Sequence, residues 1–258
     1  MPTVKLSTKA YNGSQLRKTD ENLKTMLKGL KVEAKTLMRT TRGWVEVSVA
    51  GEDQNIAIRY LAEKIGLCPT NSEISKFFTT KGYLIDPNNS KTELGIDVGT
   101  GETEKTAVSI PVKSLQTQLC DGKKIPLTKI TGIFGLCKNL PITIKILNVD
   151  KATGNIEAEL AEKQQKHYQE WTKSLLDRLI VIGASQDAIK LALKETGLTR
   201  DTIDVEPLGF FEHAIVCKLG TDAKGLIPRI GRRLREASFT VFSPKTILNT
   251  LENRSTST

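Results

Sequence analysis

The stretch KGYLIDPNNSKTELGIDVGTGETEKTAVSIP, residues 81–111, contains three short apolar runs separated by turn-forming residues. Two more runs follow, PITIKILNVD at 141–150 and NIEAELAE at 155–162, and a helical segment at 112–120 comes after the third run. Proline, asparagine and glycine in the intervening turns separate the runs. Five short strands with this spacing predict a small Greek-key barrel of the OB type.

The segments on either side of this barrel combine helical and strand periodicities. Residues 1–70 follow the order strand, helix, strand, strand, helix. Residues 163–245 begin with a helix and continue as strand, helix, strand, strand, helix, strand. These orders are typical of ferredoxin-like α/β sandwiches. We therefore expect an α+β protein in which two ferredoxin-like α/β sandwiches flank a five-stranded OB-type β-barrel at 74–162, with a polar, disordered tail at 246–258.

The net charge of the chain is +9, which favours anionic partners through long-range attraction. The excess is unevenly spread: residues 1–70 hold 12 basic and 7 acidic side chains, a balance of +5, whereas residues 71–162 hold 11 of each. Lysine excess is also a common way to keep a protein soluble. Charge alone therefore leaves nucleic-acid binding and simple solubility both open.

The middle segment resembles the S-one type RNA-binding OB domain, a family named after a bacterial ribosomal protein. The resemblance is carried by the opening strand at 81–85, the second strand at 94–99, the third strand at 107–111 and the closing hairpin near 148–156. It implies a barrel surface that binds RNA. The family commonly has aromatic residues on its second strand for base stacking, but Leu94 and Ile96 stand near those places here, so Tyr83 is the one ring expected on this surface.

Two further resemblances involve the rest of the chain. LGTDAKGLI, residues 219–227, resembles the helix-opening motif of ACT domains, which are small regulatory modules that bind amino acids, although Lys224 stands where that motif usually has proline. The order of OB domain, helix and ferredoxin-like domain is similar to that of the alpha subunit of archaeal and eukaryotic initiation factor two. The whole chain is similar to an uncharacterised archaeal family of unknown function, through stretches such as QLCDGKKIPL and EHAIVCKLGTDAKG.

KGLIPRIGRRLREA, residues 224–237, carries four arginines at helical spacing. An apolar stripe is formed by Leu226, Ile227, Ile230 and Leu234. The arginines on the other side can therefore face a phosphate backbone or only solvent. Lysines of the barrel are the other candidates. The expected nucleic-acid contacts are Lys81, Tyr83, Lys91, Lys105, Lys113, Lys123, Lys124, Lys224, Arg229, Arg232, Arg233 and Arg235.

The sequence contains no motif for a nucleophile, a metal site or paired carboxylates, and GIDVGTGETEKT lacks the spacing of a phosphate-binding loop. None of the four cysteines lies in a C-x-x-C pair, and His213 alternates with apolar residues as a core histidine would. We therefore expect no enzyme, no cofactor and no metal site. The N-terminus lacks the apolar region of a signal peptide and no apolar run reaches the length of a membrane span, which predicts a cytoplasmic protein that does not contact membranes.

These features favour a non-catalytic RNA-binding protein that acts in translation, ribosome biology or transcription and grips the RNA backbone through lysine and arginine. The expected partner is RNA, with the ribosome or RNA polymerase as the larger assembly. Two alternatives stay open: a regulator whose ACT-like domain responds to a small metabolite, and a scaffold that docks on a large complex through protein contacts. The target RNA, the oligomeric state and the role of the excursion at 121–141 also stay open.

Overall fold

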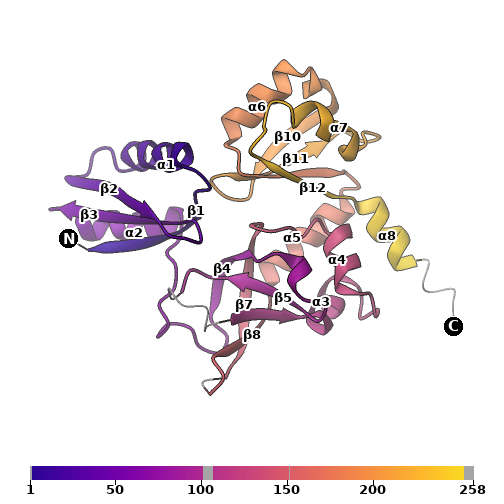
Figure 1. The fold of residues 1–258 in the computed structure, drawn as a ribbon, viewed down its shortest axis with the longest axis horizontal. Helices are drawn as coiled ribbons and strands as arrows, with labels where there is room; N and C mark the ends of the chain where they lie inside the picture. Colours follow the sequence, from indigo (N-terminus) through magenta and orange to yellow (C-terminus); the bar gives the residue numbers. More distant parts are fainter. Residues whose placement is uncertain (1, 101–106, 151, 253–258) are drawn as a thin grey trace.

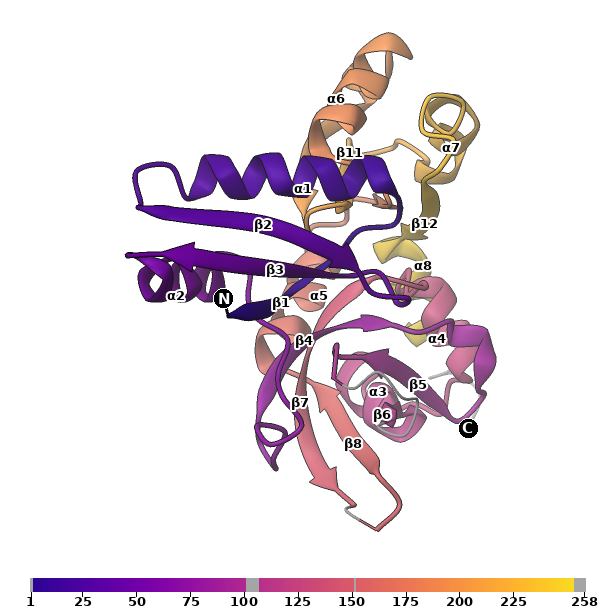
Figure 2. The same cartoon turned by 60° about the vertical axis from the view of Figure 1, so that its left-hand side comes forward.

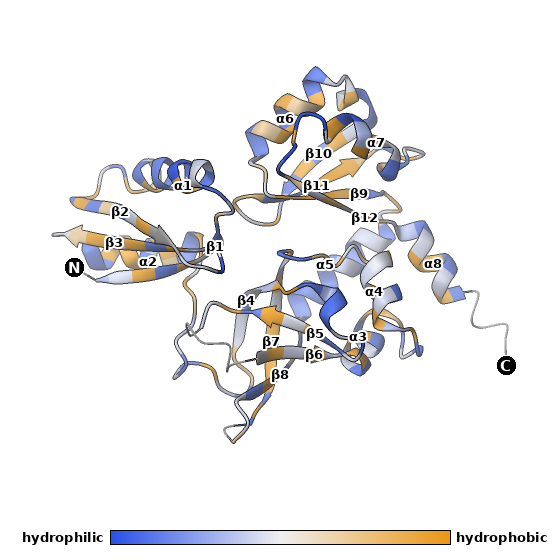
Figure 3. Ribbon diagram, in the orientation of Figure 1, coloured by the Kyte–Doolittle hydropathy of each residue, from blue (hydrophilic) through white to orange (hydrophobic). Residues whose placement is uncertain are grey.

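The computed structural model describes residues 2–100, 107–150 and 152–252. Three sheets follow one another along the chain, and the middle one closes into a barrel (Figure 1). This arrangement confirms the predicted α+β fold, with a five-stranded barrel between two antiparallel sheets that carry helices. Figure 3 shows that the strands β7, β9 and β11 are mostly apolar, as strands that pack into cores must be.

The N-terminal domain is a three-stranded antiparallel sheet with two helices. Its elements are β1 (Thr3–Lys9), α1 (Gly13–Met26), β2 (Val32–Arg39), β3 (Trp44–Gly51) and α2 (Gln54–Lys64). The sheet order is β1-β3-β2. A single bridge between Leu6 and Leu67 stands beside β1, where a ferredoxin-like fold would place its fourth strand. The side chains of Val45, Val47 and Val49 are fully buried, so these alternate residues form the core face of β3.

The barrel has the strand order β4-β5-β6-β8-β7 and closes between β7 and β4. Strands β6 and β8 are parallel and the other pairs are antiparallel, so the last strand lies between the third and fourth, as in a Greek-key OB barrel. Figure 2 shows the barrel below the N-terminal sheet. The elements are β4 (Thr79–Leu84), η1 (Pro87–Asn89), β5 (Glu93–Asp97), β6 (Ala107–Pro111), α3 (Val112–Leu119), α4 (Leu127–Ile133), β7 (Pro141–Val149) and β8 (Asn155–Leu160).

The C-terminal domain follows the helix α5 (Glu162–Lys173). Its sheet has the order β10-β11-β9-β12 with antiparallel neighbours, which is the ferredoxin-like arrangement. The remaining elements are β9 (Arg178–Ile182), α6 (Gln186–Glu195), η2 (Leu198–Asp201), β10 (Thr202–Pro207), β11 (Glu212–Cys217), α7 (Ala223–Ile230), β12 (Ser238–Phe242) and α8 (Pro244–Glu252).

The two faces of the C-terminal sheet pack against different partners. Leu179 and Val181 of β9 share a core with the inner faces of α6 and α7. The alternate residues of the same strand, Ile180 and Ile182, join the barrel core instead, together with Phe242. Because side chains alternate across a strand, the C-terminal sheet stands between α7 and the barrel.

Two segments differ from the sequence-based prediction. Tyr168 and Trp171 of α5 are buried in the core cluster of the barrel, so this helix packs against the barrel as well as leading into the third domain. Part of the expected disordered tail is helical, because α8 begins at Pro244, a residue well suited to the first turn of a helix, and Ile247 is fully buried. Residues 253–258 of the expected tail lie outside the described residues.

Candidate nucleic-acid interface

Tyr83 was expected to offer its ring to a base, and this prediction is wrong. The side chain is 0% exposed, and its ring meets the ring of Trp44 edge to face, with the centroids 5.2 Å apart. Trp44 belongs to β3 of the neighbouring domain, which covers this side of β4. Tyr83 is therefore a residue of the interdomain core, and it cannot stack on RNA.

Two of the predicted lysines contact other parts of the chain. The ammonium group of Lys81 donates a hydrogen bond to the carbonyl oxygen of Leu208 at 3.3 Å, and burial lowers the pKa of this lysine. The ammonium group of Lys123 donates to the carbonyl oxygen of Leu251 in α8. Both lysines lie at contacts with the C-terminal part of the chain, and neither forms an open barrel surface.

Three other predicted lysines, Lys91, Lys113 and Lys124, are exposed on the barrel domain. Lys91 precedes β5 and Lys113 lies in the first turn of α3, and the two segments are joined where the amide of Val112 donates to the carbonyl oxygen of Thr92 at 2.8 Å. Lys91 and Lys113 thus flank one end of the β5–β6 face. Lys105 lies outside the described residues.

The arginine segment is only partly helical. Helix α7 ends at Ile230, where Gly231, a poor helix former, follows, and Arg232, Arg233 and Arg235 lie in turns beyond it. All four arginines are exposed. Arg229 donates to the carbonyl oxygen of Thr196, and Arg233 lies 3.3 Å from the Glu195 carboxylate.

The start of α7 is capped by the chain itself. A carboxylate oxygen of Asp222 accepts a hydrogen bond from the Lys224 amide at 3.0 Å, which occupies one of the free donors that an anion would need. Lys224 is exposed nearby. Since the C-terminal sheet separates α7 from the barrel (Figure 1), the structure does not bring the arginines and the barrel lysines into one surface.

A cavity of about 650 Å³ opens instead on strands β5 and β6, between the barrel and the N-terminal domain. In OB folds the face of the second and third strands is the usual binding surface for oligonucleotides, and β5 and β6 are those strands here. The cavity, which we call the β5–β6 groove, is lined by Gly95, Asp97 and Ser109 of these strands, by Lys9, Tyr11 and Arg42 of the N-terminal domain, and by Ile85, Glu93, Lys138 and Asn139.

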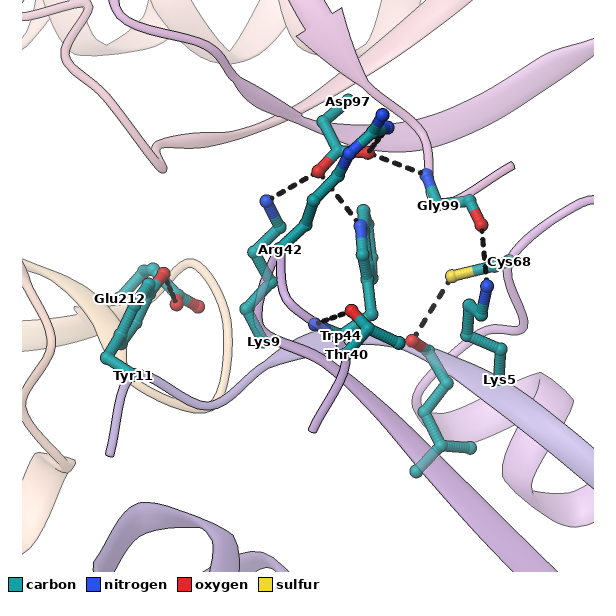
Figure 4. A network of polar contacts seen from close by, with 11 residues as sticks. Lys5, Lys9, Tyr11, Thr40, Arg42, Trp44, Cys68, Asp97, Gly99 and Glu212 are labelled. Atoms are coloured by element: carbon teal, nitrogen blue, oxygen red, sulfur yellow. Dashed lines mark hydrogen bonds and ion pairs between the residues drawn. The ribbon is translucent and has the colours of Figure 1, made fainter. Parts of the chain in front are cut away.

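A buried ionic network forms one wall of the β5–β6 groove (Figure 4). One carboxylate oxygen of Asp97 accepts from the Lys9 ammonium at 2.8 Å and from the Trp44 indole nitrogen at 2.9 Å. The other accepts from the Gly99 amide at 3.1 Å and lies 3.7 Å from the Arg42 guanidinium. The side chains of Lys9 and Asp97 are only 4% and 7% exposed. This pairing joins the N-terminal domain to the end of β5.

The accessible charge of the groove is modestly positive. Lys9 and Asp97 compensate each other, which leaves Arg42, with 35% of its side chain exposed, and the exposed Lys138. Glu93 is the exposed acid, and it accepts a hydrogen bond from the Ser109 hydroxyl at 2.8 Å. Ile85 is 42% exposed and adds an apolar surface. The groove therefore offers two cations, several polar groups and apolar contact area.

Tyr11 is a lining residue of the groove, and its hydroxyl contacts the third domain. The hydroxyl donates to a carboxylate oxygen of Glu212 at 2.5 Å. Burial is the largest cause that raises the pKa of both groups, that of Glu212 to about 7 and that of Tyr11 well above its usual range. Tyr11 thus connects the groove wall to the C-terminal domain.

Sequence reasoning missed Lys9, Tyr11, Arg42 and Lys138. Lys9 and Asp97 are 88 residues apart in the chain, and no periodicity within either segment indicates that they meet. Arg42 lies in the turn between β2 and β3, where a cation is ordinarily a solvated residue. The missing information was the contact between the first domain and the barrel.

Three family models match this chain: the DUF2110 N-terminal domain over residues 3–71, the DUF2110 central domain over 79–172 and the DUF2110 C-terminal domain over 176–242. The chain belongs to the DUF2110 family. The expected membership of a family of unknown function is thereby confirmed, and its archaeal origin stays a prediction. The central DUF2110 match includes α5 almost entirely, in agreement with the packing of that helix on the barrel.

No curated protein matches the chain. Among solved structures, it is similar to the a/eIF2alpha–aDim2p–rRNA complex from Pyrococcus horikoshii OT3, with 12% identity and a TM-score of 0.25 over 48% of this chain and 64% of that one. It is also similar to a protein from Thermus thermophilus, with 12% identity and a TM-score of 0.16 over 99% of this chain and 43% of that one. The chain spans less than two thirds of either structure, and at these TM-scores neither likeness bears on function.

Within the described ranges, no group of three or more histidine, cysteine, aspartate or glutamate side chains is arranged to hold a metal ion. None of the helices described for this chain is both long enough and apolar enough to cross a membrane.

Proposed function

We propose that this DUF2110 protein binds single-stranded RNA without catalysing a reaction, and that the strand lies in the β5–β6 groove. The observation that carries the proposal is the position of the groove: a cavity with two accessible cations lies on the second and third strands of an OB-type barrel. This is the face that OB folds commonly use for oligonucleotides.

Each class of side chain in the groove has a role in such a complex. Arg42 and Lys138 contact phosphate oxygens, and the planar guanidinium of Arg42 suits a bidentate contact. Ser109 and Asn139 provide hydrogen-bonding groups for base edges, and Ile85 supports a base by apolar contact. The side chains of Leu94 and Ile96 are buried in the barrel core, so neither stands at an outward stacking position as the sequence comparison suggested. Because the alternate residues of β5, Glu93, Gly95 and Asp97, carry no ring, backbone contacts dominate the affinity of the groove.

We also propose that this binding serves translation, ribosome biology or transcription in the cytoplasm, with the ribosome or RNA polymerase as the assembly that presents the RNA. The net charge of +9 supports association with such large polyanionic particles. The regulator and scaffold alternatives predict little affinity for free RNA, so an RNA titration separates them from this proposal.

The proposal is tested by fluorescence anisotropy with a labelled RNA of about 12 nucleotides, within the range of OB site sizes, at several salt concentrations. The groove variant R42E/K138E is compared with K224E/R232E, which makes the same change in net charge in α7 and the turn after it, on the other side of the C-terminal sheet. We expect the groove variant to lose affinity for RNA. The slope of its log K against log salt should be smaller by the contribution of about two phosphate contacts.

The control variant is expected to keep a slope close to that of the unmodified protein. Equal losses in both variants would show that only the total charge matters, and the groove would then be excluded as the specific site. A larger loss in K224E/R232E would move the site to the arginine segment.

A further inference from the structure

Phe77 is an aromatic residue on the barrel that no motif in the sequence singled out. It stands just before β4, its side chain is 62% exposed, and its φ of +71° lies in the left-handed region. A bulky residue seldom adopts this conformation, because its Cβ crowds the backbone. The chain therefore keeps a large apolar ring exposed to solvent at a residue with a strained backbone conformation. Strain of this kind is found more often at functional sites than elsewhere.

The backbone around Phe77 forms a β-bulge that directs the ring outward. The amide of Phe77 donates to the carbonyl oxygen of Ile146 at 2.8 Å, and the amide of Ile146 donates to the carbonyl oxygen of Phe78 at 2.9 Å. Two residues thus oppose one on β7, and the residue in the left-handed position of such a bulge is ordinarily glycine. Phe78 packs against the barrel core, while the extra residue, Phe77, projects away from it.

Two lysines flank the exposed ring. The ammonium nitrogen of Lys76 lies 5.1 Å from the ring centroid of Phe77, and that of Lys145 on β7 lies 5.3 Å from it. Both distances are within the range of a cation–π contact. Lys145 also lies 3.9 Å from the Glu159 carboxylate, with 41% of its side chain exposed. Both ammonium groups lie over the ring, and this charge differs from the apolar centre that a protein-binding hot spot has. A base that stacks on the ring would displace the two ammonium groups toward its own phosphates.

We propose that Phe77 is a stacking platform for an unpaired nucleobase of single-stranded nucleic acid, and that Lys76 and Lys145 hold the phosphates on either side of that base. The inference rests on the proposed RNA binding and extends it to a second contact on the same barrel. An exposed ring among cations is the combination that single-strand binding proteins use, because every base has a face that stacks.

The two contacts can be bridged by one strand. Phe77 and Ile85, which lines the β5–β6 groove, are eight residue steps apart along β4 and its flanks, a path of at most about 26 Å at 3.3 Å per residue. OB domains engage roughly 4–16 nucleotides. A strand of that length reaches from the groove to the platform, which supplies the aromatic contact that β5 lacks.

Phe77→Gly tests the platform, because glycine is the residue that the bulge favours. The variant removes the ring and relieves the backbone, so its Tm is expected to equal or exceed that of the unmodified protein. Its affinity for the labelled 12-nucleotide RNA is expected to fall roughly 5- to 100-fold, with the salt slope unchanged because no charge is removed. Leu175→Gly is the matched control, since Leu175 is also 54% exposed with a φ of +57° but has no aromatic ring.

Phe77→Trp is expected to retain the affinity, and Phe77→Leu, which keeps apolar bulk without a ring, to lose it. An RNA with 2-aminopurine in place of adenine should show quenching on binding that is absent with Phe77→Gly. If Phe77→Gly and Leu175→Gly bind RNA equally well while R42E/K138E does not, the platform is wrong and the groove stands. If the unmodified protein binds no RNA even at low salt, the proposed RNA-binding function is wrong. If Phe77→Gly has a lowered Tm, its loss of RNA affinity can come from the missing ring or from the lower stability. The affinity of Phe77→Leu then decides: a loss supports the platform, and full affinity contradicts it.

Discussion

The ion pair between Lys9 and Asp97 makes a quantitative prediction about how the first domain is attached to the barrel. Asp97→Asn keeps the size of the side chain and its ability to accept a hydrogen bond from Trp44, but it removes the negative charge beside a lysine that is 4% exposed. Removing one partner of a buried pair leaves an uncompensated charge, which costs about 3–5 kcal/mol. For a chain of this size, the expected loss corresponds to a decrease in Tm on the order of 10 °C.

The assay is chemical and thermal unfolding of a double-mutant cycle with Lys9→Met, Asp97→Asn and K9M/D97N. Since the double variant leaves no buried charge of the pair, it should recover most of the loss, with a coupling energy above roughly 1.5 kcal/mol. Glu46→Gln is the control, because Glu46 and Lys5 lie 3.7 Å apart with about a quarter of each side chain exposed. Such a pair contributes less than about 1 kcal/mol.

Two results would contradict this role of the ion pair: a loss for Asp97→Asn no larger than that for Glu46→Gln, or losses in K9M/D97N that simply add. The first result would mean that water solvates Lys9 in place of Asp97, and the second that Arg42 compensates Asp97 independently of Lys9. The network would then be incidental to the attachment of the first domain.

Three further outcomes follow from the same junction. Burial raises the pKa of Glu212 to about 7, so the folded protein binds a proton that the unfolded chain releases above about pH 4.5. Unfolding free energy should therefore fall between about pH 4.5 and 7 and level off above, and Glu212→Gln, measured by urea titration at pH 5 and pH 8, should remove that part of the decrease. Gly209→Ala would place a Cβ 2.0 Å from a carboxylate oxygen of Glu212, and thermal melts should show a loss of about 1–3 kcal/mol. Tyr83→Ala should lower the unfolding free energy by about 3–5 kcal/mol. Because the ring contributes by packing, Tyr83→Phe should keep the stability within about 1 kcal/mol and leave the salt slope of RNA binding unchanged. A changed slope would mean that Tyr83 contacts RNA.

Local patterns predicted the elements of this fold well. The short apolar runs between turn residues became β4 to β8, and the mixed helix and strand orders on both sides became the two flanking sheets. The expected helix at 224–237 was shorter than its arginine pattern suggested, because Gly231 follows the last helical residue and turns continue from there. These outcomes depend on neighbouring residues, which are visible in the sequence.

The candidate site depended on contacts between domains. Alternation along β4 correctly predicts on which face of the strand the side chain of Tyr83 lies. It does not predict that Trp44 of the first domain covers that face. Packing of the first domain also brought Arg42 to the barrel, and contact with Leu208 of the third domain half-buried Lys81. Phe77 was passed over because a bulge, which breaks the alternation, decides that its ring projects outward.

Composition and periodicity over a few residues are enough to predict the secondary-structure order, the barrel with its two flanking α/β units and the positive net charge. Packing between domains sets which cations are buried, which line the β5–β6 groove and which lie beyond the C-terminal sheet. The physical reason is that exposure and charge compensation are set by partners far away in the chain, such as Asp97 for Lys9, and no local period records those partners.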